Sequence, residues 1–256
     1  HASSDNYEDA VMSRVTTVGC RRCGGGLAGE TFFSNVAEGA RLADSLGKEL
    51  LVLEGSGAAI PPVHADATLL IVGAGQGVSY VRDFLGPYRL GIADAVIIAG
   101  AEEPTASAVD LADLVSAIRA HREDVPIALA TFRPRPLGDV SGARVFFATT
   151  APAGVLPMLS AHLEAEYGCE VVAASPHLSD RTKLRADMAE WAGRYDLLLT
   201  ELKAAAIDVV AAAGAEAGVP TVLCDNEPVT VDEVDLAGVI EHVVARALAR
   251  HEARSA

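Results

Sequence analysis

Residues 50–62 read Leu50-Leu-Val-Leu-Glu-Gly-Ser-Gly-Ala-Ala-Ile-Pro-Pro62. Four consecutive apolar residues run into a carboxylate and then into a glycine-rich loop. A continuous apolar run without alternation is typical of a strand that is buried on both faces of a parallel sheet. The stretch therefore predicts a buried strand over 50–54 with an acid at its C-terminal end.

The same pattern recurs along the chain, with Ala-rich segments between the apolar runs. Further strands are expected at 15–18, 68–72, 95–99, 127–131, 145–148, 170–174, 196–200 and 221–224. Helices are expected at 34–46, 106–121, 155–166, 181–194, 204–217 and 231–251. Alternation of this kind predicts an α/β fold. A Pro- and Gly-containing stretch interrupts it, which predicts one domain over 1–132, a linker over 133–142 and a second α/β domain over 143–256.

Composition narrows the classes of function. Half of the 256 residues are apolar, and 35 acidic residues against 20 basic ones give a formal charge of −15. This composition excludes disorder as the main state and argues against a general nucleic-acid or membrane-surface binder. No apolar run reaches the roughly 18 residues of a membrane span, and four cysteines without a signal peptide point to a reducing cytoplasm. We expect a soluble, cytoplasmic protein without nucleic-acid or membrane partners, and a homo-oligomer stays open.

The first candidate site is the loop Gly19-Cys-Arg-Arg-Cys-Gly-Gly-Gly-Leu-Ala-Gly29. Glycines let backbone amides approach an anion, and paired arginines can clamp phosphate oxygens. The candidate phosphate ligands are Arg21, Arg22, Gly24, Gly25 and Gly26. Cys20 and Cys23 also have the spacing of metal ligands, although a structural zinc site needs four. An anion loop is the favoured interpretation, and a metal or redox site and a simple tight turn are the alternatives.

Glu54 is the second candidate, because ligands bind at the C-terminal ends of parallel strands in open α/β sheets. Its carboxylate can hold Mg²⁺, and Gly55, Ser56 and Gly57 can lie beside the γ-phosphate of ATP. The alternative is a solvated acid followed by a glycine turn. The chain contains no G-x-x-x-x-G-K-[ST] motif, which is the main difficulty for an ATP site.

Polar residues follow two predicted strands in the second half of the chain, at Ser175–Arg181 and Thr200–Lys203. They can reach the same cleft, and Arg133 and Arg135 of the predicted linker can join them. The simpler interpretations are that Ser179 caps the next helix and that Lys203 is a surface lysine.

Three long motifs resemble those of the cyclic 2,3-diphosphoglycerate synthetase family: Thr17–Glu30, Leu53–Pro62 and Thr200–Asp208. Glu54-Gly-Ser-Gly57 also resembles the magnesium-associated turn of dethiobiotin synthetase, and 142–208 resembles the second domain of lipid A 4′-kinase. The resemblance implies the later strands of a P-loop NTPase-like, mostly parallel sheet, followed by a smaller Rossmann-like α/β domain. The P-loop itself would lie upstream, so the chain is expected to be the C-terminal part of such an enzyme.

The reaction that this resemblance implies is an ATP-dependent ligation. It closes a phosphoanhydride within 2,3-bisphosphoglycerate and yields cyclic 2,3-diphosphoglycerate, ADP and phosphate. Arg21 and Arg22 would act on the substrate phosphates and Glu54 would hold Mg²⁺. Contacts from the second domain would come from Arg133, Arg135, Arg181 and Lys203. The alternatives are a P-loop kinase of a small phosphorylated acid and a non-catalytic metal-binding module built on Cys20 and Cys23.

Overall fold

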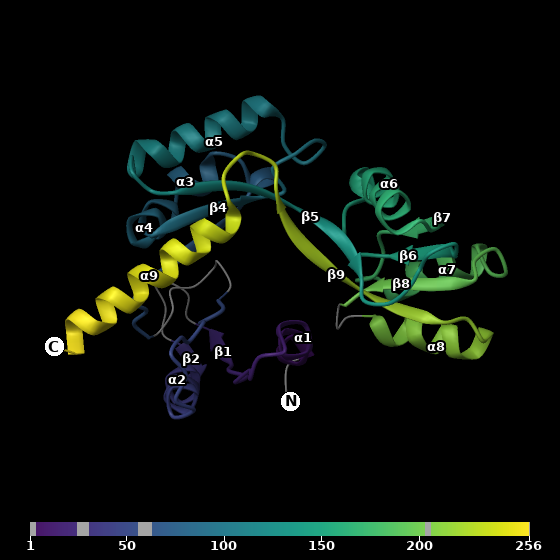
Figure 1. Cartoon of the computed structure of the whole chain (residues 1–256), viewed down its shortest axis with the longest axis horizontal. Coiled ribbons are helices and arrows are strands. Elements are labelled where there is room, and N and C mark those ends of the chain that lie inside the picture. The colour runs from purple at the N-terminus through teal and green to yellow at the C-terminus, as the bar shows by residue number, and fades with distance from the viewer. Residues whose placement is uncertain (1–3, 25–30, 56–62, 203–205, 256) are drawn as a thin grey trace. The chain divides into compact units, whose positions relative to one another are not determined.

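The computed structural model describes residues 4–24, 31–55, 63–202 and 206–255. The chain divides into two compact units (Figure 1). The first comprises His1–Ile98, Asp110–Leu129 and Asp232–Ala256, and the second comprises Ala99–Val109 and Ala130–Val231. Within the described residues, no helix is both long enough and apolar enough to cross a membrane.

The first unit combines a small hairpin with strands of the main sheet. In the hairpin, β1 (Arg22–Gly24) pairs antiparallel with β2 (Thr31–Ser34). In the main sheet, β3 (Leu69–Gly73) neighbours β4 (Ala95–Ala99). The amide of Asp94 donates to the carbonyl of Thr68 over 2.8 Å, so these two strands start side by side. The helices are α1 (Ser4–Ser13), α2 (Val36–Asp44), α3 (Ser79–Arg82), α4 (Gly86–Ile92), most of α5 (Ala108–His121) and α9 (Leu236–Ser255), with a 3₁₀ turn at Ala74–Gln76.

Burial in the first unit follows the periodicity of each element. In β4, Ala95, Val96 and Ile98 are fully buried, as expected for a continuous apolar strand. In α5, the buried residues Leu114, Ala117 and Ile118 recur at helical spacing, which turns one face of the helix toward the core. Ile71 of β3 is 60% exposed, so this strand is not covered on both faces.

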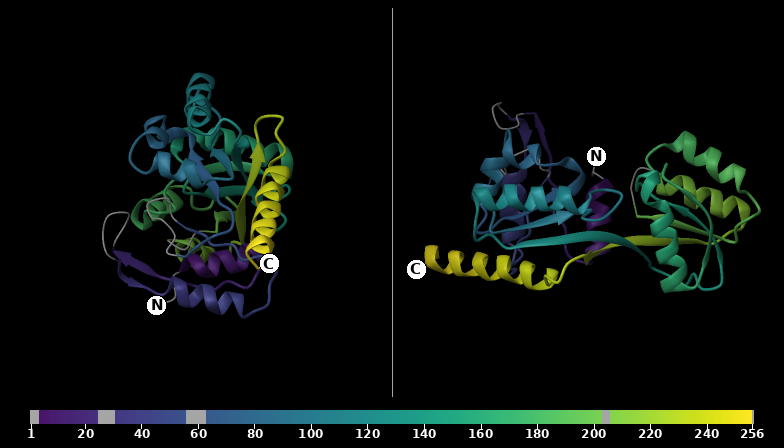
Figure 2. Two further views of the ribbon diagram at one scale, coloured as in Figure 1. Left: turned by 90° about the vertical axis from the view of Figure 1, so that its left-hand side faces the viewer. Right: turned by 90° about the horizontal axis from the view of Figure 1, so that it is seen from above.

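The second unit is a mostly parallel sheet with one antiparallel strand. Strand β6 (Arg144–Ala148) pairs in parallel with both β7 (Glu170–Ser175) and β8 (Leu197–Glu201). Strand β8 also pairs in parallel with β9 (Thr221–Thr230). Strand β5 (Ile127–Pro136) runs antiparallel along β9, as two views show (Figures 1 and 2). Helices α6 (Leu156–Tyr167), α7 (Arg181–Glu190) and α8 (Ile207–Ala217) connect the parallel strands, and a 3₁₀ turn at Ala153–Val155 precedes α6.

Alternate residues of β6 face two different cores, because successive side chains of a strand point to opposite faces. Phe146 and Ala148 pack in a cluster with residues of α7 and α8. Val145 and Phe147 pack in a second cluster with residues of α6. Figure 1 accordingly shows α6 and α8 on opposite sides of β6 and β8. The helices on both faces explain why every core residue of this strand is apolar.

The α/β fold and the mostly parallel sheet are confirmed, but the strand expected over 50–54 does not form. Residues 51–55 are irregular, and the side chains of residues 50–53 are 38–83% exposed. A strand needs a hydrogen-bonded neighbour, and no described strand pairs with this segment. Residues 15–18 are irregular as well.

The segment expected as a linker, 133–142, begins as strand rather than loop. Residues 130–136 pair with β9, from Ala130 opposite Thr230 to Pro136 opposite Cys224. Pro134 and Pro136 have no amide hydrogen, so they cannot donate hydrogen bonds to a second neighbouring strand. In the described sheet, the strand paired with this part of β5 is β9. Strand pairing therefore continues through a stretch whose prolines suggested an interruption.

Candidate functional site

Polar side chains gather at the C-terminal edge of the parallel strands in the second unit. Thr149 and Thr150 directly follow β6, Ser175 ends β7 and Glu201 ends β8. The register places Ala148 opposite both Ser175 and Thr200, so these strand ends lie at the same level. This is the edge at which open α/β sheets bind ligands.

Glu201, at the end of β8, connects the loop after β6 to β9. Its side chain is buried, and its Oε2 accepts hydrogen bonds from the amide of Thr150 at 2.6 Å and from the Thr150 hydroxyl at 2.8 Å. Its Oε1 accepts one from the side-chain amide of Asn226 in β9. A buried carboxylate is stable only with such partners. Glu201 therefore fixes the start of the loop that follows β6.

Cys224 lies beside this carboxylate and is also buried. Burial, and next the negative charge of Glu201, raise the pKa of the Cys224 thiol far above its ordinary value. Since the thiolate is the reactive form of cysteine, Cys224 is a packing residue rather than a nucleophile.

A second polar group at the same edge contains a histidine and an aspartate. The Nδ1 atom of His177 lies 2.8 Å from Oδ2 of Asp187, which α7 supplies. The Ser175 hydroxyl donates to the same oxygen at 2.5 Å. The side chain of His177 remains 34% exposed, so solvent and ligands can reach it.

Arg133, predicted as a phosphate contact, makes a bidentate ion pair with Glu102. Its two terminal nitrogens lie 2.6 and 2.7 Å from the carboxylate, which also accepts a hydrogen bond from the Thr131 hydroxyl. The hydrogen bond from Arg133 is the main reason that the pKa of Glu102 is lowered, and the same bond raises the pKa of Arg133. A phosphate at Arg133 would have to displace this carboxylate.

The other two predicted arginines of the second unit are also paired. Arg135 lies 2.8 Å from Asp225 and 3.6 Å from Glu227. Arg181 makes two 2.8 Å contacts with Asp208. Both arginine side chains are about half exposed, so these pairs form and break more easily than a buried pair.

The predicted residues of the first unit are placed differently from the expected loop. Arg22 and Gly24 belong to strand β1, because hairpin pairing with β2 extends the backbone there. The side chain of Asn35 accepts a hydrogen bond from the Arg21 amide at 2.6 Å, which fixes the backbone while the Arg21 side chain stays exposed. Glu54 is exposed in the irregular segment that also contains Gly55. The remaining predicted residues lie outside the described residues: Gly25, Gly26, Ser56, Gly57 and Lys203.

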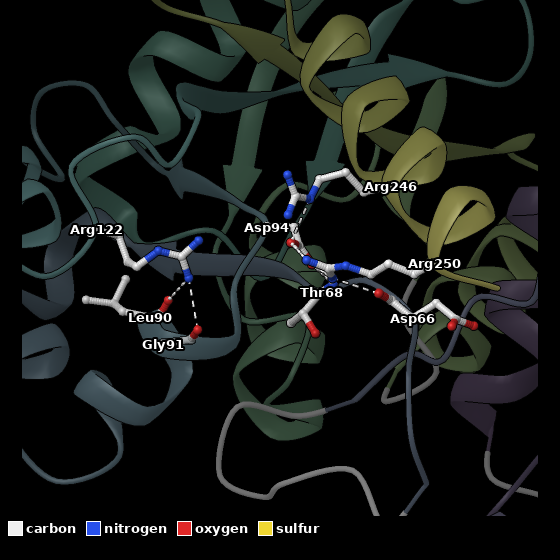
Figure 3. Close-up of polar contacts among 8 residues, drawn as sticks. All are labelled: Asp66, Thr68, Leu90, Gly91, Asp94, Arg122, Arg246 and Arg250. Carbon is white, nitrogen blue, oxygen red and sulfur yellow. Dashed lines mark hydrogen bonds and ion pairs between the residues drawn. The ribbon is translucent and has the colours of Figure 1, made fainter. Parts of the chain in front are cut away.

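The first unit also contains a cavity of about 660 Å³ at the start of β3 and β4. Asp94, which is buried there, accepts hydrogen bonds from Arg246 at 3.0 Å and from both terminal nitrogens of Arg250 at 2.8 Å (Figure 3). The Thr68 amide adds a bond of 3.1 Å. Burial alone would raise the pKa of Asp94, but the Arg250 hydrogen bond and the other contacts outweigh it and lower that pKa.

The cavity has the features of a structural anchor more than of a binding site. It lies at the N-terminal ends of β3 and β4, opposite the edge at which α/β sheets bind ligands. The arginines that line the cavity donate hydrogen bonds to groups of the protein itself. Arg122, for example, donates to the carbonyls of Leu90 and Gly91 at 3.1 and 2.9 Å. Arg246 and Arg250 both belong to α9 (Figure 3), so Asp94 attaches this helix to the strands.

The sequence pointed to both polar segments of the second unit, and the structure shows a hydrogen-bonded network there that uses other side chains of the same edge. Charge drew attention to Arg181 and Lys203, whereas the buried network uses Glu201 and Thr150, and His177 pairs with Asp187. A usable signal existed for Glu201, because it directly follows the strand that the sequence predicts over 196–200. No local signal identifies Asp187 as a partner of His177. Across the described ranges, no group of three or more His, Cys, Asp or Glu residues is placed to hold a metal ion.

Comparison with known proteins gives two family matches. The P-loop domain of cyclic 2,3-diphosphoglycerate synthetase matches residues 1–130, and the C-terminal domain of that synthetase matches residues 136–227. The synthetase of Rubrobacter xylanophilus is 55% identical over 229 residues, which are 90% of this chain and 52% of that protein. The synthetase of Methanothermus fervidus is 48% identical over 233 residues, which are 91% of this chain and 51% of that protein. The chain thus spans about half the length of these curated relatives.

Proposed function

The chain belongs to the cyclic 2,3-diphosphoglycerate synthetase family, and from this membership we propose that it takes part in an ATP-dependent ligation. The proposed reaction closes a phosphoanhydride within 2,3-bisphosphoglycerate and releases ADP and phosphate. The observation that carries the proposal is the identity of 48–55% to two named synthetases, which covers 90–91% of this chain. The parallel order of β9, β8, β6 and β7, with helices on both faces, supports a Rossmann-like second domain.

The chemical difficulty of this reaction is repulsion between anions. Two phosphates of one small molecule must approach each other, and a third phosphate must approach them. Positioning and fixed positive charge account for most of the catalysis of phosphoryl transfer. A site for this reaction therefore needs cations that face the phosphates from more than one direction.

We assign these contacts to the residues that the sequence singled out. Arg21, held at its backbone by Asn35, extends an exposed guanidinium from the hairpin of the first unit. Arg22 and the glycines beside it, Gly24, Gly25 and Gly26, complete this anion-binding segment. In the second unit the contacts are Arg133, Arg135, Arg181 and Lys203, and each of the three paired arginines would exchange its carboxylate for a phosphate.

The residue assigned to Mg²⁺ is Glu54, with Gly55, Ser56 and Gly57 beside the γ-phosphate of ATP. Mg²⁺ commonly takes one or two carboxylates together with phosphate oxygens, so a single exposed glutamate fits this donor set. When bound, the ion would neutralise charge on the transferred phosphoryl group.

Phosphorus NMR tests the proposal directly. The chain is incubated with Mg-ATP and 2,3-bisphosphoglycerate, both alone and joined to the remaining half of the Rubrobacter xylanophilus synthetase. The expected result is a new pair of ring phosphate resonances together with ADP and inorganic phosphate. Product without ring phosphates and without inorganic phosphate would favour the kinase alternative. Unchanged spectra from a folded protein that binds ATP would refute both.

A further inference from the structure

The imidazole ring of His177 is oriented by a hydrogen bond at one of its two nitrogens, Nδ1. Its Nδ1 lies 2.8 Å from Oδ2 of Asp187, and a carboxylate oxygen can only accept a hydrogen bond. Nδ1 of the neutral imidazole therefore carries the proton, and Nε2 keeps its lone pair. Nε2 has no hydrogen-bond partner in the described part of the chain, and the side chain is 34% exposed.

The neighbouring serine supports the carboxylate instead of competing for the imidazole. The Ser175 hydroxyl donates to Oδ2 of Asp187 at 2.5 Å, and Ser175 itself is only 1% exposed. In a serine hydrolase the imidazole would contact the serine hydroxyl, which must also be accessible to the substrate. This arrangement therefore leaves the imidazole, not the serine, as the group that can react.

His177 lies at the edge that contains the Glu201 network. The amide of Leu178 donates to the Thr149 carbonyl at 3.1 Å, and the Thr149 amide donates to the Ser175 carbonyl at 3.0 Å. These bonds connect the segment after β7 to the loop after β6, whose next residue is Thr150. The free imidazole nitrogen is thus part of the ligand-binding edge and not of a remote surface.

We propose that Nε2 of His177 accepts a proton from a substrate phosphate at this edge, with Asp187 and Ser175 as positioning residues. The inference rests on the proposed function. A phosphate monoester has a second pKa of about 6, so some bound substrate arrives with one protonated oxygen. Such an oxygen is a poor nucleophile until its proton leaves.

The proposed step breaks the O–H bond of that phosphate and forms an N–H bond at Nε2. The electron pair stays on the oxygen, which attacks the phosphorus of the neighbouring phosphate after that phosphate has received the γ-phosphoryl group of ATP. The new P–O bond closes the ring as the P–O bond from that phosphorus to the transferred phosphate breaks and inorganic phosphate leaves. The resulting imidazolium keeps its Nδ1–H contact with Asp187, whose negative charge stabilises it. The step needs no reactant beyond those of the proposed reaction.

Nitrogen NMR of the full chain with ¹⁵N-labelled histidine gives a test that does not depend on turnover. The His177 signals are identified by their loss in His177→Gln. We expect the Nδ1–H tautomer in the free protein and a shift of Nε2 toward its protonated position when 2,3-bisphosphoglycerate is added. Asp187→Asn should abolish the tautomer preference. His121, an exposed histidine at the end of α5, should not respond and serves as the matched control.

Turnover in the phosphorus NMR assay then separates a catalytic role from a structural one. His177→Gln should lower kcat by about 10²–10⁴-fold, the usual effect of losing a general base, with KM nearly unchanged, and His121→Gln should change neither.

The outcomes separate the proposed role of His177 from the proposed function of the chain. Substrate binding seen by calorimetry with an unmoved Nε2 signal, or normal kcat in a folded His177→Gln variant, would overturn the role of His177 alone. Absence of binding and of cyclic product in the unsubstituted protein would overturn the proposed function, and the role of His177 with it. If His177→Gln does not fold, the His177 signals are identified instead by their change in Asp187→Asn, and the wild-type titration still decides.

Discussion

Replacing Asp94 by Asn tests whether its buried carboxylate attaches α9 to the first unit. The Asp94 side chain is 3% exposed and receives three hydrogen bonds of 2.8–3.0 Å from Arg246 and Arg250. Asparagine keeps the size and one acceptor oxygen, but it loses the charge and turns an N–H₂ group toward a guanidinium.

The expected loss of stability follows from these contacts. A hydrogen bond to a charged group contributes about 1.5–3 kcal/mol, and breaking a fully buried ion pair costs about 3–5 kcal/mol. Because the two arginine side chains are 45% and 46% exposed, water partly replaces the lost partner. We therefore expect the free energy of unfolding of the first unit to fall by about 2–3 kcal/mol, less than for a fully buried pair.

Thermal unfolding and hydrogen exchange measure this effect. The Tm of the first unit should fall by about 4–12 °C, and amides of α9 should exchange faster. Asp208→Asn is the matched control, because Asp208 makes two 2.8 Å contacts with Arg181 but its side chain is 62% exposed. Its loss of stability should be much smaller than that of Asp94→Asn, because water screens an exposed ion pair. Equal losses in the two variants would refute the argument from burial.

The difference in stability between the wild-type protein and Asp94→Asn should depend on pH, and the direction of the pKa shift of Asp94 fixes the sign of that dependence. The pKa of Asp94 is lowered in the folded protein relative to 3.8. Its stabilising contribution is therefore fully present at pH well above 3.8 and is lost as pH falls through the lowered folded pKa. The difference in stability between wild type and Asp94→Asn should shrink as the pH falls into this range in a series of urea titrations. A difference that stays constant would contradict the assignment.

Three further predictions concern packing, substrate binding and the Glu201 network. Gly214→Ala places a Cβ within 2.8 Å of a backbone carbonyl oxygen and should lower the free energy of unfolding in urea by about 1–3 kcal/mol. In Gly91→Ala the new Cβ meets open space, and this variant should stabilise its helix by up to about 1 kcal/mol. Arg21→Ala should weaken binding of 2,3-bisphosphoglycerate by about 1.5–3 kcal/mol in calorimetry without lowering stability, since its side chain is exposed; equal losses in both would mean a structural role. Glu201→Gln should destabilise the second unit by about 1–3 kcal/mol, because one oxygen acceptor becomes a donor facing donors, whereas the exposed Glu216→Gln should be neutral in the same assay.

The apolar pattern of the sequence correctly predicted several of the buried strands. The strand expected at 95–99 matches β4, and the apolar runs at 145–148 and 196–200 correspond to β6 and β8. The run at 50–54 has the same pattern and forms no strand, since pairing depends on a neighbour that the pattern does not contain. The helix expected from 181 is α7, but its N-cap is Asp180, not Ser179: the Asp180 carboxylate accepts from two backbone amides of the first turn.

The candidate site was less predictable because its contacts are distant in sequence. Arg133 is 31 residues from Glu102, and Glu201 is 51 residues from Thr150. Charge alone suggested that Arg133 was available to a phosphate, whereas the fold supplies it with a carboxylate. The sequence could place polar groups at the strand ends, but it could not say which of them are already satisfied by hydrogen bonds.

The antiparallel pairing of β5 and β9 has a consequence for how the chain can be divided. Ala130 lies opposite Thr230, so the continuous segment of the second unit begins and ends at adjacent positions. It has the topology of an inserted module, which could be excised or transplanted by joining two neighbouring ends. Only Ala99–Val109 belongs to this unit from outside the segment, and it brings Glu102 to Arg133. A module cut at Ala130 would lose that carboxylate and present an uncompensated arginine where the intact chain has an ion pair.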